Sequence, residues 1–278
     1  MITSRYNPLI QHARAVSKGL SKELIFVEGL RLCEEAVRSR LACEEALYTE
    51  KFAQDERAVA LLAQLKRNGS RCTIISENIF ASLTDTKTPQ GTVVLARRPA
   101  TDRPAFEASF RQDPLIVILH RINNPANAGA MVRVAEAVGA TGVVATEGTT
   151  DLLSPKALRG AMGSSFRLPL WTHAKFDDVL SWCRERGVCT VSADLAATQT
   201  HTDVAWTGAH AVIMGAEAGG LTEREIQLAD ERIRIPMQPP VESLNVAVAL
   251  AVVLYEAARQ RTLQAPGSSP KSTLPAGD

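Results

Sequence analysis

LIVILHRINNPANAGAMVRVAEAV, residues 115–138, sets the fold class of this chain of 278 residues. It begins with a continuous apolar run, 115–120, of the kind that forms a strand buried on both faces of a parallel sheet. A loop rich in Asn, Pro and Gly follows, and a helical pattern continues to about Val138. A buried strand that leads directly into a helix predicts an α/β fold with a mostly parallel sheet.

The alternation of strands and helices continues towards the C-terminus. Three further strands are predicted, at Gly142–Ala145, Val188–Ser192 and Ala211–Met214. Three further helices are predicted, at Pro155–Met162, Asp177–Arg186 and Thr222–Ala229. Ligands of such sheets bind beyond the carboxyl ends of the strands, so the loops that follow the strands are the place to look for a site.

The first hundred residues form a second α/β pattern. Its predicted strands are Leu24–Val27, Ala46–Thr49, Cys72–Ile75 and Thr92–Ala96, and its predicted helices are Leu30–Arg40, Asp55–Arg67 and Glu77–Leu83. Prolines amid charges then break the periodicity. We therefore expect a smaller N-terminal domain over 1–98, a linker over 99–113 and a larger domain over 114–262. The Pro-, Gly- and Ser-rich tail, 263–278, is expected to be disordered.

Composition excludes several classes of protein. A hydrophobic content of 45% with 22% charged residues is typical of a globular protein, and no apolar run is long enough to span a membrane. The N-terminus lacks the apolar core of a secretory signal, and the five scattered cysteines are interpreted as reduced thiols of a cytoplasmic protein. The net charge of +1 divides into +4 for residues 1–98 and −3 for the rest, which permits RNA binding without requiring it.

Two loops of the larger domain carry candidate site residues. The loop after the first strand contains Asn127 and Gly129, with Arg133 further along the helix; taken alone, these are an ordinary turn and a surface arginine. The loop after Met214, GAEAGG, sets Glu217 among small residues that let a backbone approach a ligand closely. It is not a dinucleotide-binding fingerprint, because it lacks the G-x-G-x-x-G order.

The third candidate is Ile235–Ala258, IPMQPPVESLNVAVALAVVLYEAA. The apolar run 246–254 has no polar face, so this helix is expected to be buried on nearly all sides. Ser243 is the expected N-cap, and Asn245 then lies just inside the helix, where its amide needs hydrogen-bond partners. Two interpretations are open: a cap bonded to a neighbouring loop, or a helix N-terminus presented to a ligand.

Other catalytic signatures are missing from the sequence. It contains no H-E-x-x-H, G-x-S-x-G or P-loop motif and no paired cysteines with metal-ligand spacing, so no metal is expected. The five histidines do not cluster and are interpreted as structural or surface residues. His120, at the end of a strand beside the first loop, is the one to inspect.

Together the three loops resemble the SpoU/TrmH family of RNA ribose 2′-O-methyltransferases, which belong to the SPOUT (α/β-knot) class. The first is similar to the family's Asn-x-Gly-x-x-x-Arg motif and the second to its Gly-x-Glu-x-x-Gly motif. The third resembles the Ile-Pro-Met … Ser-Leu-Asn-Val motif, and the likeness covers about residues 115–260. The matching residues are Asn127, Gly129, Arg133, Gly215, Glu217, Gly220, Ile235, Pro236, Met237, Ser243, Leu244, Asn245 and Val246.

The N-terminal part resembles the family's substrate-binding domain, which has a ribosomal-protein-like α/β fold. The similar phrases are SRYNPLI (4–10), FVEGLR (26–31) and TKTPQG (86–91). Two positions depart from the family pattern. Pro239 stands where the family usually has Gly, which puts contacts from residues 238–240 in doubt, and Asn124 stands where many relatives carry Asp.

The resemblance implies a deep trefoil knot that holds S-adenosylmethionine in a bent form. The implied cofactor-binding residues are Gly215, Ile235, Met237, Ser243, Leu244 and Asn245, with Met214 as a further wall. The implied catalytic residues are Arg133, Asn127, Glu217, Ser243 and Asn245. Family proposals make the arginine matching Arg133 the general base, but a guanidinium is so strongly basic that it gives up a proton reluctantly. Orientation of the ribose or phosphate is the other role open to it.

The expected function is therefore methylation of a ribose 2′-hydroxyl in RNA by a homodimer, with 23S rRNA as the expected substrate. A tRNA substrate is the alternative within the enzyme class, although tRNA-specific relatives usually lack the N-terminal domain. A non-catalytic RNA-binding or ribosome-assembly factor is the alternative outside that class. The sequence does not name the nucleotide, nor whether its methylation is housekeeping or confers antibiotic resistance.

Overall fold

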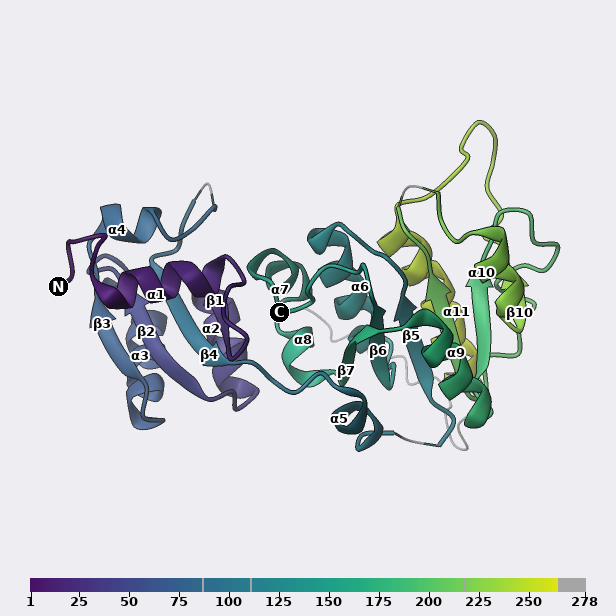
Figure 1. Ribbon diagram of the computed structural model, residues 1–278, viewed down its shortest axis with the longest axis horizontal. Helices are drawn as coiled ribbons and strands as arrows, with labels where there is room; N and C mark the ends of the chain where they lie inside the picture. Colours follow the sequence, from purple (N-terminus) through teal and green to yellow (C-terminus); the bar gives the residue numbers. More distant parts are fainter. Residues whose placement is uncertain (87, 111, 218, 265–278) are drawn as a thin grey trace, which may run out of the picture.

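The computed structural model describes residues 1–86, 88–110, 112–217 and 219–264. Its N-terminal part is built on a four-stranded sheet with the strand order β1-β4-β2-β3 (Figure 1). β2 and β3 are parallel, and β4 runs antiparallel to both β1 and β2. The elements are α1 (Pro8–Ser17), β1 (Leu24–Glu28), α2 (Leu30–Arg38), β2 (Cys43–Tyr48), a 3₁₀ turn (Phe52–Gln54), α3 (Glu56–Arg67), β3 (Arg71–Ile74), α4 (Glu77–Ala81) and β4 (Thr92–Arg97).

The C-terminal part is built on a six-stranded sheet with the order β10-β8-β9-β5-β6-β7, in which each recorded strand pair is parallel. Its strands are β5 (Leu115–Leu119), β6 (Gly142–Thr146), β7 (Leu170–Ala174), β8 (Cys189–Ala193), β9 (His210–Met214) and β10 (Glu231–Ile233). Its helices are α5 (Arg103–Glu107), α6 (Pro125–Ala137), α7 (Pro155–Ala161), α8 (Ser164–Arg167), α9 (Phe176–Glu185), α10 (Glu223–Leu228) and α11 (Val246–Gln264). The mostly parallel α/β sheet expected from the sequence is confirmed.

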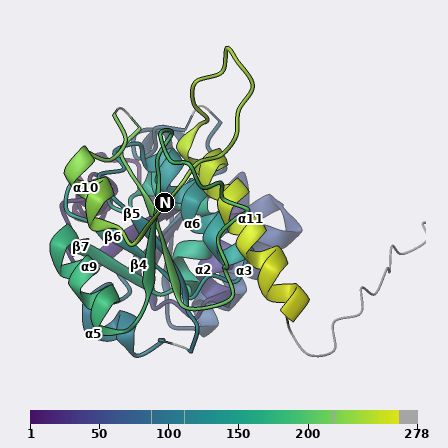
Figure 2. The same ribbon diagram turned by 90° about the vertical axis from the view of Figure 1, so that its right-hand side faces the viewer.

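Strand β5 lies at the centre of this sheet and explains why 115–119 is apolar throughout. Its odd-numbered residues, such as Val117, pack in the core that includes α6 and α11, while Ile116 and Ile118 face the core that includes α9 and α10. Both faces of the strand are covered, so no position in it needs a polar side chain. Figure 2 shows α11 and α6 on one side of the sheet and α9 and α10 on the other.

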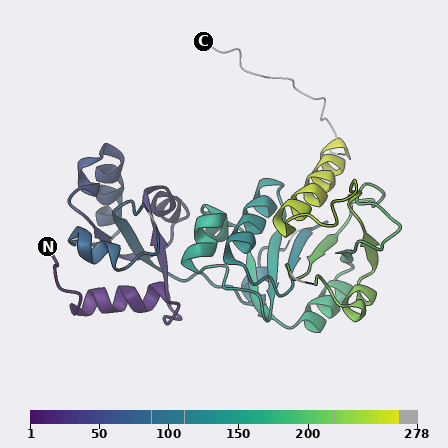
Figure 3. The same ribbon diagram turned by 90° about the horizontal axis from the view of Figure 1, so that it is seen from above.

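The N-terminal and C-terminal parts are in contact where helix α7 packs against strand β1 (Figure 3). Arg159 of α7 pairs with Glu28, a carboxylate buried at the end of β1, at 3.1 Å. Arg98 pairs with Asp151 at 2.6 Å, across the point where the chain passes from one sheet to the other. These pairs are partly buried and hold the N-terminal part against the body that carries the three motif loops.

Several elements differ from the sequence-based expectations. Helix α1 and strands β7 and β10 were not predicted, because they are short or carry a mixed pattern of polar and apolar residues. Within the predicted linker 99–113, residues 103–107 form α5, because Phe106 packs against Trp171 and Trp182 in the core. Of the tail predicted to be disordered, residues 263–264 continue α11, and 265–278 lie outside the described residues.

Helix α11 also differs from its prediction. It begins at Val246 rather than after Ser243, and the Asn245 side chain caps it, with Oδ1 accepting a hydrogen bond from the Ala247 amide at 2.9 Å. Burial on nearly all sides is wrong for the isolated chain: Leu250 is fully buried, but Val248 is 50% exposed. In the described part of the chain, no helix combines the length and apolarity that crossing a membrane requires.

Candidate functional site

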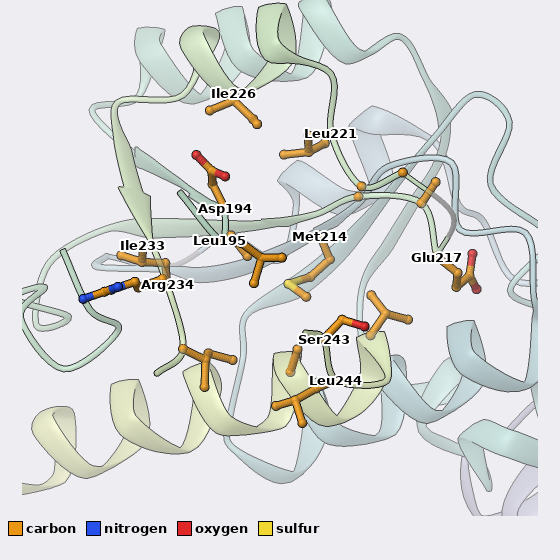
Figure 4. A pocket seen from close by; sticks show the side chains of 18 of the residues that line it. Asp194, Leu195, Met214, Glu217, Leu221, Ile226, Ile233, Arg234, Ser243 and Leu244 are labelled. Carbon is orange, nitrogen blue, oxygen red and sulfur yellow. The ribbon is translucent and has the colours of Figure 1, made fainter. Parts of the chain in front are cut away.

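A cavity of about 490 Å³ opens at the carboxyl ends of β8, β9 and β10 (Figure 4). Three loops line it: the turn after β8, the glycine-rich loop after β9, and the segment that joins β10 to α11. Its walls are largely apolar, with Met214, Leu221, Ile226, Ile233, Leu244 and Val246 among the lining residues. Its volume and apolar lining are typical of pockets that bind small ligands or cofactors.

Five of the six residues predicted to bind the cofactor line this cavity. They are Gly215, Ile235, Met237, Ser243 and Leu244, and the further wall residue Met214 lies with them. Asn245 does not line it but follows Leu244 directly. Residues 238–242 are exposed and are not among the lining residues, and this loop extends away from the body (Figure 2). The departure from the family pattern at Pro239 therefore lies outside the cavity wall.

Gly215 is required by the close packing of the glycine-rich loop. A Cβ at this position would lie 2.6 Å from both the carbonyl carbon of Gly220 and the amide nitrogen of Leu221. The loop thus folds back tightly on its own backbone and leaves peptide groups, rather than side chains, at this part of the cavity.

A chain of side-chain hydrogen bonds, from two amides to one carboxylate, joins the three motif segments. Asn245 donates through Nδ2 to Asn127 Oδ1 at 3.2 Å, and Asn127 donates through Nδ2 to Glu217 Oε1 at 3.2 Å. Glu217 also accepts from the backbone amides of Asn123 and Asn124, at 3.3 and 3.2 Å. We call Glu217, Asn127 and Asn245 the amide network. The side-chain amide of Asn245 therefore has the hydrogen-bond partners that it needs: its oxygen caps α11, and its nitrogen donates to Asn127.

The electrostatics of Glu217 follow from these contacts. Burial raises its pKa, but hydrogen bonds from its own amide, from the Asn127 side chain and from two loop amides outweigh that effect, so its pKa lies below the usual value. Glu217 is therefore a carboxylate at neutral pH, and it acts as an acceptor that holds the first loop in place. Asn124, where many relatives have Asp, caps α6 by accepting from the Ala126 amide at 2.9 Å, which an aspartate oxygen could do equally well.

Arg133 lies apart from the cavity. It is exposed on α6, and no hydrogen bond or ion pair of its guanidinium is recorded with the rest of the described chain. Its position six residues beyond Asn127 turns it about 120° around the helix from that side chain. The structure thus brings Asn127, Glu217, Ser243 and Asn245 to one edge of the cavity, and it leaves the Arg133 side chain facing solvent.

His120 is buried behind the first loop rather than in the cavity. Its Nδ1 lies 2.9 Å from Thr146 Oγ1 and its Nε2 lies 3.1 Å from Glu225 Oε1, while its ring packs on Phe176. Burial, together with the adjacent charge of Arg121, lowers its pKa to about 4. His120 is therefore a neutral structural residue, as its sequence context suggested, and within the described residues no cluster of metal-ligating side chains is found.

Sequence reasoning missed part of the cavity. The end of β8 contributes Ala193, the turn after it contributes Asp194 and Leu195, and α10 contributes Ile226. The rule that ligands bind at the carboxyl ends of parallel strands pointed to the first group, since β8 was predicted. Ile226 carries no comparable signal, because its role depends on how α10 packs over the loop.

Comparison of the sequence with known proteins identifies a family of RNA methyltransferases. The SpoU rRNA methylase family model matches residues 114–255, and an MRM3-like substrate binding domain model matches residues 20–94. An uncharacterized tRNA/rRNA methyltransferase of Synechocystis is 30% identical over 94% of this chain and 94% of its own length. The 23S rRNA (guanosine-2′-O-)-methyltransferase RlmB of Vibrio cholerae is 30% identical over 87% of this chain and 98% of its own.

The fold comparison agrees. The SpoU methyltransferase AviRb of Streptomyces viridochromogenes, solved in complex with AdoMet, superimposes with a TM-score of 0.83 at 27% identity, over 92% of this chain and 98% of that one. The chain belongs to the SpoU rRNA methylase family. It is an S-adenosylmethionine-dependent RNA ribose 2′-O-methyltransferase of the SPOUT class, with an N-terminal substrate-binding domain.

Proposed function

We propose that this chain methylates a ribose 2′-hydroxyl of 23S rRNA, and that it does so as a homodimer in the cytoplasm. The amide network carries the proposal, because its three members come from the first turn of α6, the glycine-rich loop and the segment before α11, and they meet beside a cofactor-sized cavity. A relative that covers nearly the same length is named for a guanosine of 23S rRNA. The substrate-binding domain over residues 20–94 and the positive charge of residues 1–98 support a large RNA substrate.

The cavity residues fit S-adenosylmethionine. Apolar walls accept a flat nucleoside base, and the peptide groups around Gly215 offer donors and acceptors to it. Gly215, Ile235 and Leu244 would hold the cofactor mainly through their backbone, with Met237 and Ser243 beside them. The cofactor supplies an activated methyl group on a sulfonium, so the task left to the protein is to align the acceptor hydroxyl with it.

The amide network would serve this alignment. Glu217 fixes the backbone of 123–124, and Asn127 and Asn245 transmit that order to the start of α11. We assign Arg133 to binding the ribose or phosphate of the RNA, because a guanidinium presents a planar fork of donors that matches these groups and, within the described residues, Arg133 is exposed. A general-base role is the weaker assignment, since it would need a neutral guanidine.

The proposed homodimer rests on an apolar stripe along α11. Val248 and Tyr255 are 50% and 59% exposed, and their spacing of seven residues puts them on one side of α11, while Leu244, which is 37% exposed, lies two residues before the helix. A contiguous apolar surface of this kind marks an interaction site in a globular protein. Because the stripe starts at Leu244, a second copy seated on it would lie close to the amide network.

Methyl transfer from labelled S-adenosylmethionine to rRNA and to tRNA, each taken from a strain lacking the gene, tests the reaction. We expect a labelled 2′-O-methylnucleoside after nuclease digestion; labelling of tRNA alone would support the alternative substrate, and a methylated base would contradict the reaction class. Calorimetry that finds no cofactor binding would favour the non-catalytic RNA-binding factor.

Sedimentation tests the assembly separately. The wild-type chain is expected to sediment as a dimer, and Val248→Glu as a monomer with unchanged circular dichroism. A monomeric wild-type protein that methylates at full rate would contradict the dimer proposal.

A further inference from the structure

The turn after β8 places one carboxylate in the cofactor cavity that none of the three motifs contains. Asp194 lines the cavity, half-buried, and Figure 4 shows it on the opposite side from Glu217, with Met214 between them. These two are the only acidic residues among the described residues that line the cavity. They differ in what already binds them.

Asp194 is held firmly and keeps one oxygen available. Its backbone amide donates to the Ile233 carbonyl at 2.9 Å, which fixes the residue against β10. Its Oδ1 accepts from the Ala196 amide at 3.0 Å, which fixes the side chain within the turn. No partner of Oδ2 is recorded among the described residues, whereas both oxygens of Glu217 are already occupied by loop donors.

Nearby positive charge does not account for this carboxylate. Arg234 also lines the cavity, but its side chain points away from Asp194 in Figure 4, and no ion pair between the two is recorded in the described part of the chain. A fixed carboxylate oxygen in a partly apolar cavity is an acceptor that needs a donor. Water can supply that donor to a half-buried carboxylate, and a ligand bound in the cavity can replace the water with a donor of its own.

The position of Asp194 indicates which part of the cofactor meets it. The methyl group must face the amide network, where the RNA ribose is proposed to bind, so the rest of the cofactor extends from there into the cavity. The apolar walls formed by Leu221, Ile226 and Ile233 suit an uncharged nucleoside better than a zwitterionic amino acid. The donors of a nucleoside nearest to its sulfur-bearing end are the two ribose hydroxyls.

We propose that Asp194 binds the ribose of S-adenosylmethionine by accepting hydrogen bonds from its vicinal hydroxyls. This makes Asp194 a specificity-determining residue that selects a ribonucleoside cofactor over a deoxyribonucleoside, as carboxylates do in dinucleotide sites of another fold. The inference rests on the proposed cofactor-dependent function and adds a contact outside the three motifs.

Calorimetry on the full chain tests the contact without needing catalysis. The probes are S-adenosylhomocysteine, 5′-methylthioadenosine, which lacks the amino-acid half, and the 2′-deoxy form of S-adenosylhomocysteine. We expect Asp194→Ala to weaken the first two probes by the same factor, about tenfold to a hundredfold, since a hydrogen bond to a charged group is lost. The wild type should bind the 2′-deoxy probe about tenfold more weakly than its parent, and the variant should bind the two equally.

Two further variants keep the result interpretable. Asp194→Asn retains an oxygen for the Ala196 amide, so it should stay folded and still lose most of the preference for the ribose hydroxyl. Asp177→Asn, at an exposed carboxylate outside the cavity, is the matched control and should change nothing.

The outcomes separate this proposal from the function it rests on. Weakening of S-adenosylhomocysteine but not of 5′-methylthioadenosine would overturn the proposal, because Asp194 would then meet the amino-acid half. Unchanged affinities, or a 2′-deoxy penalty that persists in the variant, would also overturn it. A wild type that binds none of the three probes would contradict the proposed function itself.

Discussion

The cofactor cavity and the amide network lie side by side but are built by different means. The cavity is made of glycine backbone and apolar side chains, as at Gly215 and Leu221, and most of its lining is fixed by the packing of three loops. The amide network is polar, exposed and held by hydrogen bonds of 3.2–3.3 Å. The difference leads us to propose that cofactor affinity and RNA chemistry depend on largely different residues, with Glu217 common to both regions, and substitutions should therefore separate binding from turnover.

Arg133→Ala is the strongest test of this separation. We expect methyl transfer to fall at least about 100-fold, because the RNA ribose loses its positioning group, while the affinity for S-adenosylhomocysteine stays unchanged. Filter-binding and single-turnover assays measure the two quantities. Arg224→Ala, at another exposed arginine, on α10, is the control. An active Arg133→Ala variant would remove this residue from the reaction.

Glu217→Gln breaks the amide network while keeping the size of the side chain. One of the two acceptor oxygens becomes a donor, so the amides of Asn123 and Asn124 cannot both be satisfied. We expect kcat to fall about tenfold to a hundredfold, with a loss of about 1 kcal/mol in the free energy of unfolding. Urea unfolding and steady-state kinetics measure the change, with Glu223→Gln as control. A variant that loses affinity for the cofactor but retains kcat would show that the separation is wrong.

Gly215→Ala alters the cavity instead of the amide network. Its Cβ would meet the backbone of Gly220 and Leu221 at 2.6 Å, so the glycine-rich loop must shift. We expect the affinity for S-adenosylhomocysteine to fall about tenfold, as for an overpacked site, and turnover at saturating cofactor to fall less. Calorimetry measures the affinity. Gly208→Ala, where the nearest atom lies 3.7 Å from the added Cβ, should bind normally.

A last effect, expected on stability at acidic pH rather than on binding or turnover, lies beneath both regions, at His120. The unfolded chain takes up a proton on this residue near its ordinary pKa of 6.5, whereas burial and Arg121 hold the folded value at about 4. Between these pH values the unfolded state binds more protons, so stability is complete above about 6.5 and declines by up to about 3 kcal/mol towards pH 4. Urea unfolding at several pH values measures the slope. His120→Asn should flatten it, and replacement of the exposed His12 should not; an unchanged slope in His120→Asn would assign the loss to other groups.

Much of the molecule was predictable from local patterns. Buried strands such as 115–119 were found because both of their faces are apolar, and the helices that follow them showed a clear period. Strands β7 and β10 were missed because they lie at the two edges of the sheet, where part of each strand is exposed and the apolar pattern weakens. The start of α11 was misplaced by two residues because Ser243 and Asn245 are both good caps, and the contact with Asn127 favours the second.

The sequence by itself determined the α/β class, the family and the three motif loops, because periodicity and motif spacing are local properties. The tertiary structure alone decided that Asn245, Asn127 and Glu217 form one chain of hydrogen bonds, that Arg133 faces solvent, and that Asp194 enters the cofactor cavity. The hydrogen bonds of the amide network join residues 90 and 118 positions apart, and no local pattern records which loops a parallel sheet brings to the same edge.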